Sequence, residues 1–223
     1  MGVVVVTGAF GTLGRAVVTE LVDRGYQVAG IDISSTQEET NANLTLGGVD
    51  LADEQAVINA CNEVVKQLGG IDALVNVAGG FTWEPIETGS ISSWDNMYRI
   101  NIRTAIASCR AALPFLMKSR GAIVNVGAAS SNQPGSGMAP YAASKSGVRA
   151  LTESLAEEMR GRIRVNAIAP TTLDTPANRA SMPGADTSGW VRPESAAKVI
   201  AFLVSDESGA ITGVSVPLSL GGG

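Results

Sequence analysis

The sequence of 223 residues contains no histidine and only two cysteines, Cys61 and Cys109. Without histidine there is no Ser-His-Asp triad, no Cys-His pair and no imidazole ligand for a metal ion. Two cysteines are too few for a disulfide framework or a structural zinc site, so no metal site is predicted. We expect both to be inert, buried thiols in helices of a protein of the reducing cytoplasm. Acid–base chemistry must therefore come from tyrosine, lysine, carboxylates or a cofactor.

Charge is also scarce, because charged residues make up 17% of the chain and the formal net charge is −5. A mildly acidic chain binds phosphate backbones poorly, so no nucleic-acid partner is expected. The apolar run at 3–6 is far shorter than the ~20 residues of a membrane span, and no basic region of a signal peptide precedes it. Hydrophobic residues reach 45%, which together with the length predicts one folded domain over 1–223.

Short apolar runs alternate with amphipathic stretches along the chain. Asp53 and Pro193 are residue types that favour the first positions of helices. The alternation predicts βαβ units and hence an α/β fold: a single Rossmann-type doubly wound domain, with a central parallel sheet of about seven strands and helices on both faces. The expected strands are 3–6, 28–31, 73–77, 123–126, 163–168 and 211–216, and the expected helices are 13–24, 54–68, 93–117, 138–160 and 193–205.

A glycine-rich loop follows the first expected strand and opens the first expected helix. Glycines there let the backbone turn tightly and approach a pyrophosphate at the helix N-terminus. Asp32 ends the second expected strand, where a carboxylate accepts hydrogen bonds from the adenosine ribose and repels a 2′-phosphate, so NAD(H) is favoured over NADP(H). Arg15 could offset this preference by contacting phosphate. The expected cofactor residues of the loop are Gly8, Phe10, Gly11, Thr12, Leu13 and Gly14.

Tyr141 and Lys145 lie four residues apart near the start of an expected helix, so both point to one face. A free tyrosine has a pKa of about 10 and is a poor acid–base catalyst near neutrality. A nearby ammonium group stabilises the phenolate and lowers that pKa. Because this pair follows a dinucleotide-binding loop in the same chain, we predict that it is catalytic.

These motifs, in this order, resemble the short-chain dehydrogenase/reductase family over nearly the whole chain. The resemblance implies catalytic roles for Tyr141 and Lys145, and for Asn101 as the residue that holds a water of the proton relay. It also implies a small-molecule substrate, and a homodimer or homotetramer built through the helices at 93–117 and 138–160. Further cofactor residues implied by the resemblance are Asp50, Leu51, Asn76, Ala78, Gly79, Pro170, Thr171 and Thr172, besides Tyr141 and Lys145 themselves.

Ala128 stands where the family carries a catalytic serine, and Ser130 and Ser131 are the neighbouring hydroxyls that could replace it. Thr12 and Thr171 also depart from the usual family pattern. The dihydropteridine reductase-like branch shares the missing serine and this glycine spacing, and the stretch 172–186 resembles its substrate-side loop. We therefore expect 171–190 to be a substrate-side loop or lid.

Three functions stay open at this point. The first is hydride transfer from NADH to a polarised C=N or C=O substrate, with a quinonoid dihydropteridine as one candidate, because such a substrate needs the missing hydroxyl less. The second is the same chemistry on another alcohol or ketone with a displaced serine. The third is a non-catalytic NAD(H)-sensing module. The expected substrate-side residues are Ala128 and three aromatic residues suited to stacking on a flat ring: Phe81, Trp83 and Trp190.

Overall fold

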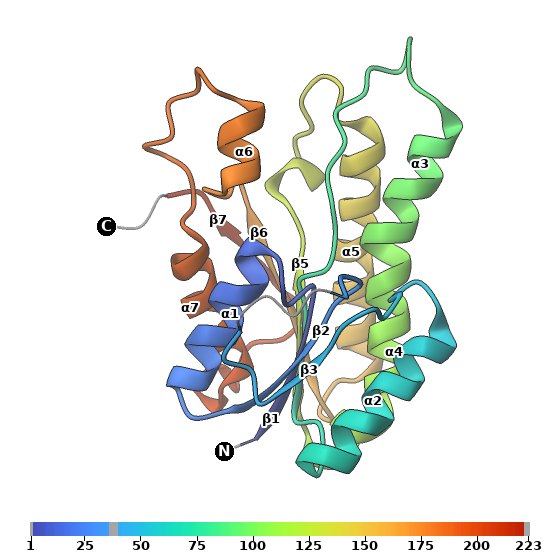
Figure 1. Ribbon diagram of the computed structural model, residues 1–223, viewed down its shortest axis with the longest axis vertical. Helices are drawn as coiled ribbons and strands as arrows, with labels where there is room; N and C mark the ends of the chain where they lie inside the picture. Colours follow the sequence, from blue (N-terminus) through green and yellow to red (C-terminus); the bar gives the residue numbers. More distant parts are fainter. Residues whose placement is uncertain (1, 36–39, 221–223) are drawn as a thin grey trace.

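The computed structural model describes residues 2–35 and 40–220. Its centre is a parallel sheet with the strand order β3-β2-β1-β4-β5-β6-β7, which confirms the predicted doubly wound α/β class (Figure 1). The order reverses between β1 and β4, so the carboxyl ends of these two strands form the switch point where such sheets bind ligands. The strands are β1 (Val3–Thr7), β2 (Gln27–Ile31), β3 (Leu44–Leu46), β4 (Ala73–Asn76), β5 (Ala122–Val126), β6 (Arg164–Pro170) and β7 (Ser215–Leu218).

Helices cover both faces of the sheet, α1 (Thr12–Asp23) and α7 (Pro193–Val204) on one, and α2 (Glu54–Leu68), α4 (Thr104–Ser119) and α5 (Ala139–Glu158) on the other (Figure 1). The valines of β1 show why the first apolar run is continuous. Val3 and Val5 pack in the core under α2 and α4, while Val4 and Val6 pack in the core under α1 and α7. A strand buried on both faces needs apolar residues at every position.

The helix-start signals in the sequence are confirmed. The Asp53 carboxylate accepts hydrogen bonds from the backbone N–H groups of Gln55 and Ala56 and so caps α2. Pro193 occupies the first turn of α7, where its missing N–H has no helical partner to lose. Both cysteines are buried in helices as expected, and burial raises the pKa of Cys61 to about 11 and that of Cys109 to about 12.

The single helix expected at 93–117 is wrong in detail. The chain forms α3 (Ile91–Met97), then a π-helical segment η1 (Tyr98–Arg103), and only then α4. A π-helical turn widens the helix and redirects its side chains, and such turns are frequent at functional sites. No pattern of apolar residues distinguishes this widening from ordinary α-helix, so the sequence could not show it.

Three further elements differ from the expectation. The strand expected at 211–216 begins later, as β7, because Gly213 turns with a φ of 78° and Ile211 N–H bonds back to the Ser208 carbonyl at 2.8 Å. The three-residue strand β3 was too short to stand out as an apolar run. The loop expected at 171–190 contains the helix α6 (Pro176–Ser181), whose first turn is capped by the Thr175 hydroxyl.

In the part of the chain that the structure describes, no helix is both long enough and apolar enough to cross a membrane. The cytoplasmic location stays a prediction.

Candidate functional site

The glycine loop between β1 and α1 lies at the carboxyl edge of the sheet. Gly8 has a φ of +65°, and a Cβ there would lie 2.8 Å from the Ala78 backbone; a Cβ on Gly14 would lie 2.0 Å from the Gly8 carbonyl oxygen. At Gly11 a Cβ would meet only that carbonyl, at 3.5 Å. Gly11 is the N-cap of α1, and no described side chain caps this helix start. Its first N–H groups are thus left for an anion, which fits a dinucleotide pyrophosphate.

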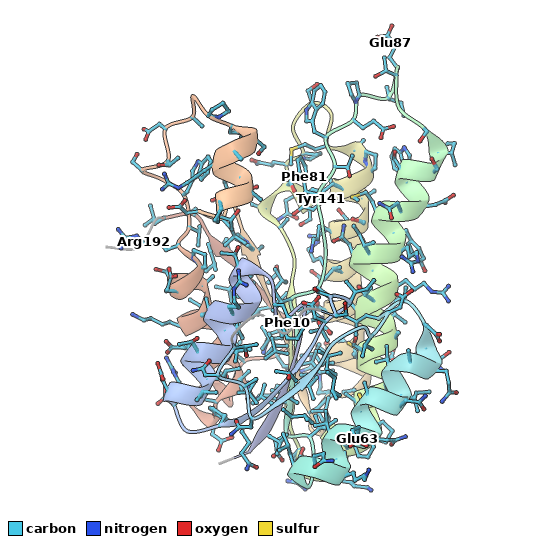
Figure 2. The ribbon with its side chains drawn as sticks, viewed as in Figure 1. Phe10, Glu63, Phe81, Glu87, Tyr141 and Arg192 are labelled. Atoms are coloured by element: carbon cyan, nitrogen blue, oxygen red, sulfur yellow. The ribbon has the colours of Figure 1, made fainter. Side chains whose placement is uncertain are left out.

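Asp32 ties this loop to the end of β2. Its Oδ2 accepts a hydrogen bond from Phe10 N–H at 2.9 Å, and its Oδ1 accepts one from Ser34 N–H at 3.0 Å. A carboxylate has about four lone-pair sites, so each oxygen keeps capacity for a ribose hydroxyl. The Phe10 side chain is buried near Gly30 and Gly47, in the middle of the molecule (Figure 2). Arg15 lines a hollow of about 410 Å³ on α1 together with Thr19, Thr40 and Asn41.

Asp50 and Leu51, implied to lie near the adenine, have different surroundings. Leu51 is buried in the core under α2. The Asp50 carboxylate forms an ion pair with Arg99 from η1 and accepts a hydrogen bond from Ala52 N–H at 2.9 Å. A half-exposed pair of this kind contributes little to stability. The pair nevertheless joins η1 to the loop that follows β3.

A buried chain of amide and hydroxyl groups runs across the sheet beneath the site. Asn76 Nδ2 donates to Asn125 Oδ1 at 2.9 Å, and Asn125 Nδ2 donates to Thr152 Oγ1 at 2.9 Å. Thr7 Oγ1 donates to Asn76 Oδ1 at the other end, at 3.5 Å. Buried polar groups need such partners. Asn125 and Thr152 were missed from the sequence, although an asparagine inside an otherwise apolar strand is itself a signal of a buried partner.

Tyr141 and Lys145 lie on the first turns of α5, as expected. Lys145 is 5% exposed, its ammonium donates to the Val126 carbonyl oxygen at 2.8 Å, and burial lowers its pKa to about 8. Burial also raises the pKa of Tyr141 to about 12. The lowering of the Tyr141 pKa by Lys145 that the sequence predicts is not seen in this structure, where burial of the phenol determines the direction of the shift and the Lys145 ammonium is bound to the carbonyl oxygen at the end of β5. Tyr141 carries its proton at neutral pH.

Asn101 is 1% exposed on the π-helical segment. Its Nδ2 donates to the Gly80 carbonyl and to Ser144 Oγ, each at 3.0 Å, and its Oδ1 accepts from Gly80 N–H at 3.0 Å. A Cβ on Gly79 would lie 2.5 Å from Asn101 Oδ1 and 3.2 Å from Lys145 Nζ. The structure thus brings Asn101, Gly79 and Lys145 together, and Asn101 fastens the loop after β4 to α5.

Ala128 follows β5 and is buried, so the position implied to carry a serine offers only a methyl group. The backbone then forms a 3₁₀ turn, η2 (Ala129–Ser131), in which Ser131 N–H bonds to the Ala128 carbonyl at 3.1 Å. Among the described residues, the Ser130 hydroxyl is buried without a hydrogen-bond partner. It is the nearest hydroxyl in sequence to Ala128 and has donor capacity to spare.

The aromatic residues expected on the substrate side do not share one environment. Phe81 contacts Tyr141 and is 53% exposed. Trp83 is 59% exposed, and its Nε1 donates to the Ser136 carbonyl at 3.0 Å. Trp190 is 8% exposed and lies next to Val191, whose N–H bonds to the Thr172 carbonyl at 2.8 Å. Pro170 ends β6, and Thr171 N–H bonds to the Leu218 carbonyl of β7 at 2.9 Å.

Replacing Lys145 with Met tests the burial of its charge through folding stability. The folded protein binds this proton more weakly than the unfolded chain, because its pKa falls from 10.5 to about 8. The wild type should therefore gain stability as the pH rises between these values, relative to Lys145→Met, by about 3 kcal/mol in all. Urea unfolding at several pH values measures this. The control is Lys198→Met, at an exposed position of α7. Its free energy of unfolding should differ from that of wild type by the same amount at every pH. The same result for Lys145→Met would contradict the account.

A dinucleotide-type glycine loop and a Tyr/Lys pair at the carboxyl edge of a doubly wound sheet define a class, the nicotinamide-dependent oxidoreductases. The family model of short chain dehydrogenases matches residues 2–185, and the chain belongs to this family. It is thus an oxidoreductase of a family that binds NAD(P)(H), takes small-molecule substrates and commonly forms oligomers.

The similar proteins carry the names of reductases and dehydrogenases. The chain is 32% identical to a 3-oxoacyl-[acyl-carrier-protein] reductase of Thermotoga maritima, over 95% of this chain and 93% of that protein. It is 32% identical to 3beta-hydroxysteroid dehydrogenase 1 of Eggerthella lenta, over 96% and 90%. Among solved structures, levodione reductase is similar with a TM-score of 0.88 and 28% identity, over 99% of this chain and 96% of that one.

Proposed function

We propose that this protein reduces a ketone carbonyl of a small molecule to an alcohol, or runs that reaction in reverse, with NADH as the preferred cofactor. The observation that carries this proposal is the placement of Tyr141 and Lys145 on the first turns of α5, with Lys145 bonded to the end of β5 and Asn101 bonded to Ser144 of the same helix. The names of the relatives support a ketone or alcohol as substrate.

When bound, the nicotinamide supplies or accepts the hydride. Gly8, Gly11 and Gly14 would hold the pyrophosphate against the start of α1, and Asp32 would accept the hydroxyls of the adenosine ribose. Tyr141 would give its proton to the substrate oxygen. Lys145 would bind the nicotinamide ribose and lie behind Tyr141, where it holds a proton on Nζ below a pH of about 8.

Reduction of a quinonoid dihydropteridine is a second candidate, and Ala128 is the observation that favours it. With a methyl group at this buried position, one donor to the developing oxyanion is absent there, and a substrate that is already polarised needs it less. In the first candidate, Ser130 would supply that donor from the turn η2.

Two further features belong to the proposal. We infer that 171–190, which holds α6 and rejoins the fold through the bridge between Leu173 and Val191, is the substrate-side lid. We also infer a homodimer or homotetramer formed through the segments 93–117 and 138–160, which carry many small residues on more than one face.

A screen of cofactor oxidation tests both candidates. The purified protein is given NADH or NADPH with a panel of cyclic and open-chain ketones, and in parallel with quinonoid dihydropterin. We expect turnover of ketones with a higher kcat/KM for NADH than for NADPH. Turnover of the dihydropterin alone would select the second candidate, and turnover of neither would contradict both.

A further inference from the structure

The rings of Phe81 and Tyr141 pack against each other edge to face. The two ring centroids are 4.9 Å apart and the ring planes meet at 89°, and the side-chain view shows the two residues as direct neighbours (Figure 2). This edge-to-face arrangement is a favourable one for aromatic pairs, because the positive edge of one ring meets the negative face of the other. Phe81 therefore covers one side of the phenol and leaves about half of its own surface to solvent.

The backbone around Phe81 is fastened on both sides. Before it, Gly80 is held by Asn101, which both donates to its carbonyl and accepts from its N–H, at 3.0 Å each. After it, Trp83 Nε1 donates to the Ser136 carbonyl at 3.0 Å, and Glu84 N–H donates to the Gly137 carbonyl at 2.7 Å. The Phe81 ring cannot leave Tyr141 without a change of rotamer or the loss of these bonds.

We propose that Phe81 is a positioning residue for Tyr141, holding the phenol in the orientation from which it transfers its proton and keeping water away from it. This inference rests on the proposed reductase function and adds to it. Phe81 then acts through Tyr141 on every substrate, whereas a residue that only stacks on the substrate acts on flat rings alone. The burial that raises the Tyr141 pKa to about 12 is consistent with such cover.

The kinetic test compares Phe81→Leu with Phe81→Tyr on one cyclic and one open-chain ketone. We expect Phe81→Leu to lower kcat about tenfold for both ketones while each KM changes less than about twofold, because a misplaced proton donor slows the chemical step. Phe81→Tyr keeps the aromatic ring and should restore most of kcat. In a Tyr141→Phe background, Phe81→Leu should have no further effect on kcat, since the group it positions is gone.

Ile86→Ala is the matched control, because this side chain is 77% exposed on the same segment, near Glu87 at its tip (Figure 2). It should leave kcat unchanged. A Phe81→Leu effect confined to the KM of the cyclic ketone, or one that persists in full without the Tyr141 hydroxyl, would overturn the proposal.

A second readout needs no turnover. Tyrosinate absorbance at pH 11 is measured for wild type and Phe81→Ala, each against its own Tyr141→Phe counterpart, with circular dichroism showing that all four are folded. Wild-type Tyr141 should stay mostly protonated, and Phe81→Ala should show a clear gain of tyrosinate as the pKa moves back toward 10. An equal tyrosinate signal from Tyr141 in wild type and in Phe81→Ala would overturn the proposal. If wild type reduces no substrate of either kind and the signal still shifts, Phe81 shields Tyr141 as inferred and the proposed function is what fails.

Discussion

Replacing Tyr141 with Phe should lower kcat for ketone reduction by a factor of about 10²–10⁴, the usual contribution of a positioned proton donor. The effect should be large because few other groups could donate this proton. The chain has no histidine, and the Lys145 ammonium on the same helix already donates to the Val126 carbonyl oxygen. Steady-state rates with saturating cofactor measure the effect. Binding of NADH, followed by fluorescence, should change less than about threefold, because Tyr141 acts on the substrate oxygen.

Tyr98→Phe is the control for this substitution. Tyr98 begins the π-helical segment and is 53% exposed, and loss of its hydroxyl should leave kcat within about twofold of wild type. Retention of more than half of the wild-type kcat by Tyr141→Phe would show that Tyr141 is not the proton donor. Ser130, with its unpartnered buried hydroxyl, would then be the next residue to replace.

Gly14→Ala should both destabilise the fold and abolish cofactor binding. Its Cβ would lie 2.0 Å from the Gly8 carbonyl oxygen and 2.8 Å from the Ala9 Cα, and these are backbone atoms that cannot move aside alone. We expect a loss of about 3 kcal/mol in the free energy of unfolding, at the upper end for overpacking. Ala is otherwise the better helix former by about 1 kcal/mol, so a loss at this helical position reports the clash. Urea unfolding measures it.

Gly11→Ala separates the two effects. A Cβ there meets only one atom, at 3.5 Å, and its φ of −73° suits any residue. Stability should change by less than about 0.5 kcal/mol, while NADH affinity should fall at least tenfold because the added methyl faces the approach of the pyrophosphate. Gly70→Ala, with no atom within 4 Å, should change neither quantity. Wild-type stability of Gly14→Ala would contradict the packing described for the loop.

The sequence predicted correctly those features that depend on residues a few positions apart. The valine run of β1, the glycine loop, the Asp53 cap and the i, i+4 pair of Tyr141 and Lys145 all follow from spacing of a few residues, and the structure places them as expected. The parallel sheet follows from the alternation of strands and helices along the chain, because parallel strands need helical crossovers.

Features that depend on distant segments could not be predicted in the same way. The direction of the Tyr141 pKa is set by burial, and burial depends on the loop after β4 as well as on α5. The pairs Asn76–Asn125 and Phe81–Tyr141 join residues 49 and 60 positions apart. Strand β7 was misplaced because the turn at Gly213 interrupts the stretch 211–216, which was expected to be one strand.

The most direct test of the central claim is transfer of a labelled hydride. The protein is incubated with a ketone from the active panel and with NADH in which both hydrogens on the reactive carbon of the nicotinamide are deuterium, and the alcohol is analysed by mass spectrometry. The account predicts that wild type forms an alcohol with one deuterium on the carbinol carbon. Tyr141→Phe should form much less of this alcohol. An alcohol without deuterium, or no alcohol from any ketone of the panel, would contradict it.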